Sequence, residues 1–185
     1  MPNEIFDAEY RDIADIIAIN NANLLKNNLD GDAGKSGFLV GEPSKVELQN
    51  IIDDKLKSLA VVLKRENEVL GYLIGFDIIK TEVDFRQQVF SLFESRGLNY
   101  EDGKVFYYSQ IAKKPNSKNI GKNLVLSMFS KVKKMGYDYI VCRIVHSPII
   151  NEASIAFHQS LGFKSVGDIA GGGYLCGIYL YILVK

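Results

Sequence analysis

The stretch IAKKPNSKNIGKNL, residues 111–124, joins a β-rich run to the most regular amphipathic helix pattern in the chain. Residues 105–112 form the β-rich run, and apolar residues then recur at helical spacing from Ile120 to Val132. Between residues 113 and 134 there are seven lysines and no acidic residue. Helix N-termini usually favour acidic side chains, because the macrodipole leaves positive charge and free N–H groups there. Lys118 and Lys122 in the first turn therefore favour a bound anion, typically phosphate, over a merely solvated basic face.

Two better-known phosphate-binding motifs do not fit this sequence. A Walker A loop needs Gly, four residues and then Gly-Lys-Ser/Thr. Gly121 and Lys122 are present, but Asn116 replaces the first glycine and Asn123 replaces the hydroxyl residue. A Rossmann loop needs spaced glycines that open a helix, whereas the glycines at 171–173 lie late in the chain and open none.

The second informative stretch is NEASIAFHQSLGF, residues 151–163. Asn151, Ser154 and His158 stand at i, i+3 and i+7, which places three polar groups on one helix face. An amide, a hydroxyl and an imidazole beside an anion site suit a long ligand with a phosphate at one end. Taken alone, His158 is more often a partly exposed helix residue than a catalytic acid.

The remaining patterns predict an α+β chain with one β-α-β unit near its middle, and a single domain over residues 1–185. Strands are expected at 4–6, 59–63, 69–78, 105–112, 137–145, 163–166 and 174–184, and helices at 13–25, 44–56, 81–96, 120–136 and 151–161. The Asn-, Gly- and Asp-rich residues 27–43 indicate a loop. Ser44 and Glu47 form a capping box at the start of the second helix. The expected apolar face of that helix is Leu48, Ile51, Ile52 and Leu56.

Together the two stretches and the order of elements resemble the GNAT superfamily of acyl-CoA-dependent N-acyltransferases. The loop of that family reads Arg/Gln-x-x-Gly-x-Gly/Ala, and the corresponding positions here are Asn116, Asn119 and Gly121, of which only the last keeps the pattern. Asn tolerates a left-handed backbone better than other non-glycine residues, so Asn119 can keep the loop shape. Lys118 and Lys122 can compensate for the lost Arg/Gln. The second stretch is the closer match.

The resemblance implies a GNAT fold, with a mixed central β-sheet whose middle strands splay apart and are flanked by helices. Strand 105–112 would separate from strand 137–145, and the pantetheine arm of acetyl-CoA would enter the gap. The pyrophosphate would lie on backbone amides of residues 117–122. The cofactor-binding residues that the resemblance implies are Ile111, Ala112, Lys113, Ser117, Lys118, Asn119, Ile120, Gly121, Lys122, Asn151, Ser154 and Phe157.

The implied reaction is direct attack of a neutral amine on the thioester, with CoA leaving as a thiolate. His158 occupies the position where the family usually has a tyrosine, and it would protonate the thiolate, whose conjugate thiol has an ordinary pKa of about 8.5. The alternative is that His158 only packs near the sulfur and that water supplies the proton. The general base stays open, because strand 105–112 has no carboxylate. Asp77, Glu101 and Asp102 are candidates for a water relay, and each can equally be an ordinary surface carboxylate.

The acceptor would meet Asp77, Tyr107, Tyr108 and Ser109. Period-two alternation puts Tyr107, Ser109 and Ile111 on one strand face, and Tyr108 and Gln110 on the other. Residues 77–102 carry six acidic and three basic side chains and form the expected acceptor-binding lid. Four aromatic residues interleave with these charges: Phe85, Phe90, Phe93 and Tyr100. The lid favours a cationic or amino-acid-like amine, unless its aromatics only seal its own core.

Composition narrows the function further. The 22 basic and 22 acidic residues give zero net charge, which argues against a nucleic-acid or membrane-surface partner. Two cysteines and two histidines are too few for a disulfide framework or a multi-histidine metal site. No signal region is evident, which favours the cytoplasm. We expect a metal-independent N-acetyltransferase that uses acetyl-CoA and a small amino-acid-like or polyamine-like amine. The alternatives are a catalytically silent acyl-CoA-binding module and a protein or peptide N-acetyltransferase; the oligomeric state stays open, a homodimer included.

Overall fold

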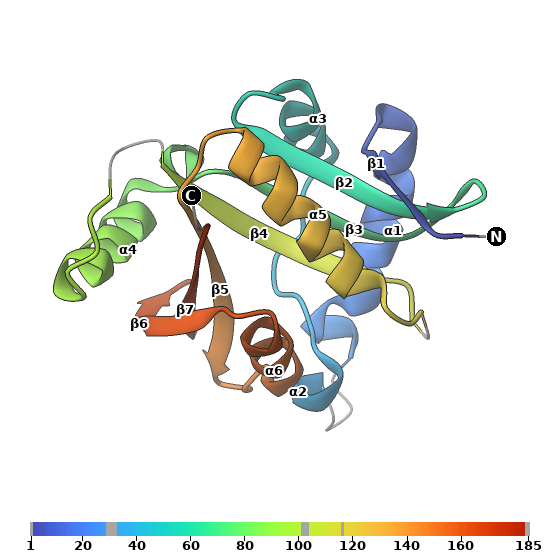
Figure 1. Ribbon diagram of the computed structural model, residues 1–185. Coiled ribbons are helices and arrows are strands. Elements are labelled where there is room, and N and C mark those ends of the chain that lie inside the picture. The colour runs from blue at the N-terminus through green and yellow to red at the C-terminus, as the bar shows by residue number, and fades with distance from the viewer. Residues whose placement is uncertain (1, 29–32, 101–103, 116, 184–185) are drawn as a thin grey trace.

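One mixed β-sheet runs through the computed structural model, which describes residues 2–28, 33–100, 104–115 and 117–183 (Figure 1). Its seven strands lie in the order β1-β2-β3-β4-β5-β7-β6. The strands are β1 (Glu4–Asp7), β2 (Ser58–Arg65), β3 (Glu68–Asp77), β4 (Val105–Lys113), β5 (Tyr139–Ser147), β6 (Lys164–Gly171) and β7 (Tyr174–Ile182). The helices are α1 (Ile13–Asn23), α2 (Ala33–Ser36), α3 (Lys45–Asp53), α4 (Val83–Ser95), α5 (Ile120–Lys134) and α6 (Glu152–Ser160).

The sheet consists of two antiparallel halves that meet at one short parallel contact. β4 and β5 pair only through Val105 with Tyr139, Phe106 with Ile140 and Tyr107 with Val141. Beyond Tyr107, β4 stays paired with β3 as far as Lys113, but its pairing with β5 has ended. The middle strands therefore splay apart, which confirms the α+β fold expected from the sequence.

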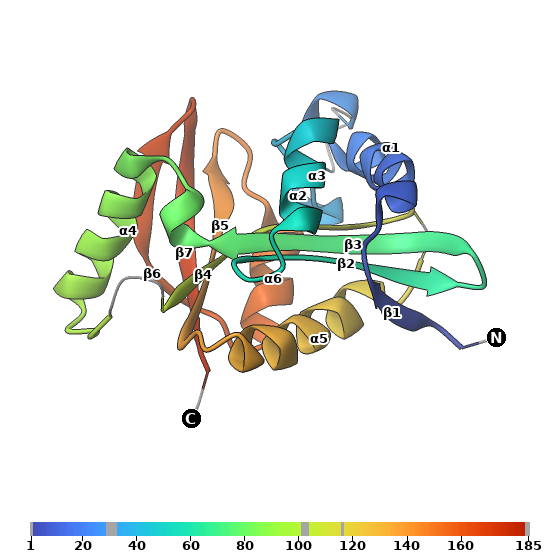
Figure 2. The same cartoon turned by 90° about the horizontal axis from the view of Figure 1, so that it is seen from above.

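Helices cover both faces of the sheet (Figure 2). On β2, Val61 and Leu63 pack toward α5, whereas Ala60 and Val62 pack toward α1 and α3. Alternate residues of a strand point to opposite faces, so a strand buried on both faces reads as a continuous apolar run. α4 covers the other half of the sheet and contacts β6.

Local sequence signals set several element boundaries as predicted. The apolar stripe of α5 is buried, and Gly136 follows the helix with a φ of +89°. In the α3 capping box, Ser44 Oγ accepts from the Glu47 N–H at 3.1 Å, and Glu47 Oε2 accepts from the Ser44 N–H at 2.7 Å. The prediction for Leu56 was wrong: α3 already ends at Asp53, and Leu56 is 86% exposed.

Two further segments differ in detail from the sequence expectation. The β2–β3 hairpin turns through Glu66 and Asn67, with Glu66 at a φ of +58°. The region expected as a loop at 27–43 contains α2. Across the described ranges, no helix is long and apolar enough to cross a membrane.

Candidate active-site cleft

A cleft of about 690 Å³ lies where β4 and β5 separate. It is lined by the second half of β4, the first turn of α5, the middle of β5, much of α6, residues 36–41 and the β6–β7 turn. All but three of the site residues predicted from the sequence line it. The exceptions are Asp77, Ser117 and Lys118.

The first turn of α5 forms one end of the cleft. Asn119 precedes the helix with a φ of +59°, the left-handed conformation expected for it, and its side chain caps no amide. The first N–H groups of a helix have no partner within the helix, and this first turn has no acidic residue. Ile120 is 1% exposed with its side chain in the core, so only its backbone is available to a ligand. Lys118 and Lys122 are exposed at this end, although only Lys122 lines the cleft.

Gly121 lets α5 approach its neighbours closely. A Cβ at this position would lie 3.1 Å from Phe157 Cζ and 3.6 Å from Ile111 Cδ1. The sequence suggested that this glycine makes room for a phosphate. The structure shows that it makes room for the Phe157 ring of α6, and the role toward phosphate stays a prediction.

A β-bulge at Ser109 corrects the predicted faces of β4. Ile74 pairs with Gln110 and Gly75 with Tyr108, which leaves Ser109 without a partner on β3. The alternation therefore resets at Ser109. Tyr107 packs in the α4 cluster, and Tyr108 and Ile111 both pack against the α5 cluster. The prediction that Tyr107 and Ile111 share a strand face was thus wrong, and so was the prediction that Tyr108 and Gln110 share the other face.

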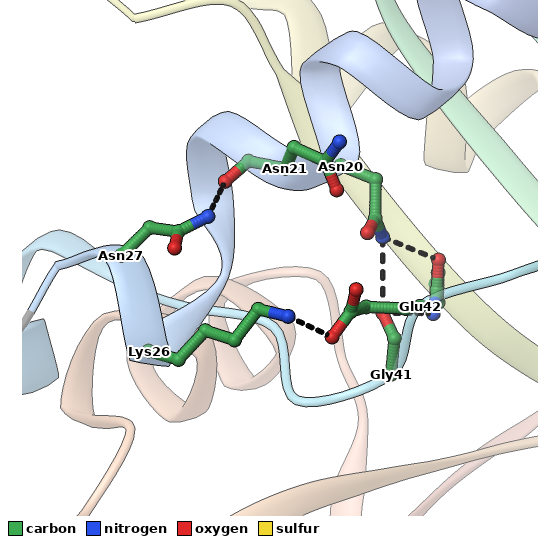
Figure 3. A network of polar contacts seen from close by, with 7 residues as sticks. Asn20, Asn21, Lys26, Asn27, Gly41 and Glu42 are labelled. Atoms are coloured by element: carbon green, nitrogen blue, oxygen red, sulfur yellow. Dashed lines mark hydrogen bonds and ion pairs between the residues drawn. The ribbon is translucent and has the colours of Figure 1, made fainter.

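A polar network on the α1 side of the sheet joins Asn20 to Gly41 (Figure 3) and includes Gln110. Asn20 Nδ2 lies 3.1 Å from Gly41 O, 3.0 Å from Tyr72 Oη and 3.1 Å from Gln110 Oε1. The Tyr72 hydroxyl donates to Gln110 Oε1 at 3.0 Å, and Gln110 Nε2 donates to Gly41 O at 3.0 Å. Lys26 and Glu42 pair at 2.5 Å beside it. The network ties residues 36–41, one wall of the cleft, to α1, β3 and β4.

Asn151 holds the same wall from the other side. Its Oδ1 accepts from the Ser154 N–H at 3.2 Å and so caps α6, while its Nδ2 donates to Phe38 O at 2.8 Å. The side chain is 5% exposed. The amide predicted to bind pantetheine is therefore engaged in joining α6 to residues 36–41.

His158 lines the cleft and is buried, with 4% of its surface exposed. Its Nδ1 lies 2.7 Å from Ser154 O and 3.3 Å from Ser154 Oγ. A carbonyl oxygen only accepts, so we assign the proton to Nδ1 and the lone pair to Nε2. Burial lowers the pKa of His158 and outweighs the opposing effect of the Ser154 carbonyl. A neutral ring in this tautomer offers an acceptor at Nε2, whereas the sequence predicted a proton donor.

Tyr108 lies beside His158, with their ring centroids 5.4 Å apart. It is 2% exposed, and burial raises its pKa well above the ordinary value of 10, so the phenol is protonated. Neither the Tyr108 hydroxyl nor His158 Nε2 has a hydrogen-bond partner among the described residues. Buried polar atoms are nearly always paired, so two orphans in one cleft indicate a place where a ligand binds.

Tyr107 and Ser109 line the cleft as predicted. Tyr107 is buried, and burial raises its pKa to about 12. Asp77 lies elsewhere and is 2% exposed. Its Oδ2 accepts from the Tyr137 hydroxyl at 3.0 Å, and its Oδ1 accepts from the Ile79 N–H at 3.0 Å. The structure therefore gives Asp77 a supporting role outside the cleft, in place of the predicted acceptor contact.

The described part of the predicted acidic lid, residues 77–100, does not line the cleft. The α4 aromatics pack instead in the cluster that covers this half of the sheet. Phe90 stacks on Tyr100 at 4.3 Å, and Phe93 meets Tyr100 edge-on at 5.8 Å. Glu101, Asp102 and Asn116, also considered from the sequence, lie outside the described residues. Residues 36–41 form a wall of the cleft in place of the lid. The sequence signal that could have predicted this wall is the apolar run Phe38-Leu39-Val40 within a mostly polar loop.

The charges that line the cleft are all positive. Lys113, Lys122 and Arg143 line it, and none of its described lining residues is Asp or Glu. Within the described part of the chain, no group of three or more His, Cys, Asp or Glu side chains could hold a metal ion.

Comparisons with known proteins agree with this geometry. No family model matches the sequence, and no curated protein matches it. Among solved structures, the chain is similar to yncA, a putative acetyltransferase of Salmonella typhimurium solved with acetyl-CoA (TM-score 0.69, 17% identity, covering 100% of this chain and 96% of that one). It is also similar to a GNAT-family acetyltransferase of Bacillus cereus (0.61, 15%, 100% of both chains) and to the ribosomal-protein-S18-alanine N-acetyltransferase of Escherichia coli (0.63, 14%, 100% and 96%). The chain therefore has the GNAT fold.

Proposed function

We propose that the protein is an N-acetyltransferase that transfers the acetyl group of acetyl-CoA to the amine of a small molecule. The observation that carries this proposal is the cleft between β4 and β5, which has a helix start flanked by Lys118 and Lys122 at one end and two lining residues whose buried polar atoms have no described partner. The solved acetyl-CoA complex of a protein with the same fold supports the choice of donor.

In this proposal, the donor lies along the free edge of β4. Ile111, Ala112 and Lys113 line the cleft where β4 is no longer paired with β5, so one row of their backbone groups is available to pantetheine. The diphosphate would meet the first-turn amides of α5, with Lys118 and Lys122 nearby. Phe157 would give the thioester end an apolar wall.

Tyr108 is the proposed proton donor. Its protonated phenol can donate to the thiolate that leaves when the amine nitrogen bonds to the acetyl carbon and the carbon–sulfur bond breaks. The proton that the amine nitrogen loses then restores the phenol, so the net products are the amide and the CoA thiol. His158 Nε2 is the matching acceptor for an N–H of a bound substrate. The neutral form of His158, which burial favours, is the form that this role needs.

The test is release of CoA thiol from acetyl-CoA in the presence of a panel of amines, with the product identified by mass. We expect release that depends on the acceptor and yields one acetylated amine per thiol. A silent acyl-CoA-binding protein would instead be stabilised by acetyl-CoA, by about 2.7 kcal/mol at 100 times Kd, without any acceptor-dependent release.

A peptide N-acetyltransferase is the second candidate, because one protein of the same fold is named for a ribosomal-protein substrate. Here residues 36–41 are held by hydrogen bonds from both Gln110 and Asn151. This two-sided attachment limits opening of the cleft and favours a small acceptor. Faster thiol release with peptides that have a free N-terminal amine than with small-molecule amines would support a peptide N-acetyltransferase.

A further inference from the structure

The cleft passes from one face of the sheet to the other. Some lining residues, such as Tyr108, Cys142 and Phe157, belong to the cluster around α5. Others, such as Tyr107 and Val145, belong to the cluster around α4. The helix end that suits the phosphates of the donor is on the α5 face. The acceptor therefore enters from the α4 face.

Arg143 is the charged residue at that entrance. It lies on β5 between Cys142 and Ile144, which face α5, so its side chain points to the opposite face. Arg143 is exposed, lines the cleft, and forms no ion pair with any described residue. Asp168 on β6 has a partner other than Arg143, because its carboxylate lies 3.1 Å from His146 Nδ1.

An aromatic residue of α4 holds the guanidinium in place. The Arg143 Cζ lies 5.5 Å from the centroid of the Phe85 ring, and that ring is also 5.0 Å from the ring of Tyr107. A cation over an aromatic face is attracted electrostatically. Phe85 thus positions both Arg143 and Tyr107 without lining the cleft itself.

This arrangement is suited to an anion. A guanidinium offers a planar fork of donors that matches a carboxylate or phosphate, and none of the described residues that line the cleft is acidic. A diamine or polyamine would find no counter-charge there. Other lining residues that belong to the α4-side cluster are Phe38, Tyr107, Val145, Tyr174 and Cys176, none of which carries a charge of the opposite sign.

We propose that the acceptor is a primary amine that also carries an anionic group, a carboxylate or a phosphate-like group, and that Arg143 binds this group. The inference rests on the proposed acetyltransferase activity. It selects the amino-acid-like acceptors over the polyamine-like ones. It also reverses the charge argument based on residues 77–102, because α4, the helix of that segment, contributes no residue to the lining of the cleft.

The test compares acceptors that share one side chain and differ in the group on the carbon that bears the amine: L-leucine, L-leucinamide, 3-methylbutylamine and the aminophosphonate analogue of leucine. The L-phenylalanine series is tested in parallel. In the wild type we expect kcat/KM to be at least about 10-fold higher for an anionic acceptor than for its amide. Arg143→Gln should lower it by about 10- to 100-fold for the anions, mainly through KM, and by less than about 2-fold for the amides. The relative rates of the amino acid and the aminophosphonate distinguish a carboxylate site from a phosphate site.

Arg96→Gln is the matched control, because it removes the same charge from an exposed position that does not line the cleft. It should change neither acceptor preference nor acetyl-CoA affinity. Amides or diamines that react as well as the anions would overturn the anionic-acceptor proposal while leaving the acetyltransferase proposal intact.

A binding measurement separates the two proposals further. N-acetyl-L-leucine and N-acetyl-L-phenylalanine are titrated calorimetrically into the CoA-saturated protein, beside their carboxamides. We expect the acids to bind at least about 10-fold more tightly than the amides, and this difference to vanish in Arg143→Gln. Acids that bind no better than amides would overturn the proposal whether or not any acceptor is turned over.

Discussion

Tyr108 and His158 each place a polar atom in the protein interior without a partner among the described residues. Leaving a buried donor or acceptor unpaired costs roughly 1–3 kcal/mol. An apolar side chain of similar size could fill either position without this cost. The polar atoms therefore point to a use in binding or chemistry. The phenol supplies a donor and the imidazole an acceptor, and this division of roles cannot be read from residue types alone.

Tyr108→Phe tests the donor role. The ring and its contacts with His158 and Phe163 remain, and only the hydroxyl is lost. We expect kcat to fall by about 100-fold, the lower range for a general acid, while Tm stays constant or rises because an unpaired hydroxyl is removed. Steady-state kinetics and thermal unfolding measure both.

Tyr137→Phe is the control for Tyr108→Phe. It removes a hydroxyl that donates to Asp77 outside the cleft, so it should lower stability by roughly 1–3 kcal/mol and leave kcat unchanged. A normal kcat in Tyr108→Phe would remove the phenol from the mechanism.

The pH dependence of stability tests the state of His158. Burial lowers its pKa in the folded protein, so the unfolded chain binds the proton more readily. Its contribution to stability is therefore fully present above the unfolded pKa of about 6.5 and is lost as the pH falls toward the folded pKa. We expect the wild type to lose stability below pH 6.5 more steeply than His158→Asn. Denaturant titrations with parallel pH profiles for the two proteins would contradict the buried neutral ring.

At the scale of elements, the contact between α5, α6 and β4 depends on Gly121. We expect Gly121→Ala to destabilise the protein by about 1–3 kcal/mol, the usual cost of overpacking, because the new methyl group would lie 3.1 Å from Phe157 Cζ. Because the two helices form opposite sides of the donor site, affinity for acetyl-CoA should fall as well. Urea unfolding and calorimetry measure these effects.

A second substitution shows whether Phe157 is the cause. In a Phe157→Leu background the ring is gone, and Gly121→Ala should become neutral or stabilising, because alanine is the better helix former. The two substitutions should thus be non-additive. Additive effects would mean that Gly121 serves the backbone alone.

For the whole molecule, the sequence predicted features that arise from neighbouring residues. The capping box at Ser44 and Glu47, the hairpin and the stripe of α5 all depend on contacts within a few positions. The bulge at Ser109 was missed because it arises from the register between β3 and β4. Arg143 was missed because its role depends on the placement of α4, and the wall at 36–41 depends on α1, β4 and α6 together.

Charge is the clearest property of the whole molecule. The chain is neutral overall, yet every charged residue among the described ones that line the cleft is basic. Helix α5 has lysines at both ends: Lys118 and Lys122 lie at its start, whereas Lys131, Lys133 and Lys134 lie in its last turn, where a helix favours cations. The helix itself gives no reason for the first pair, and the phosphates of the proposed donor would supply one.

Replacing the first pair by glutamine tests this explanation. The Lys118→Gln/Lys122→Gln protein should bind acetyl-CoA about 3- to 30-fold more weakly in 50 mM salt, from roughly 0.3–1 kcal/mol per charge near a helix end. The difference from wild type should shrink as added salt screens the exposed charges. Lys134→Gln removes a charge from the other end of α5 and should leave the affinity unchanged. Calorimetric titrations at several salt concentrations that gave equal affinities for all three proteins would instead make the lysines a solvated basic face.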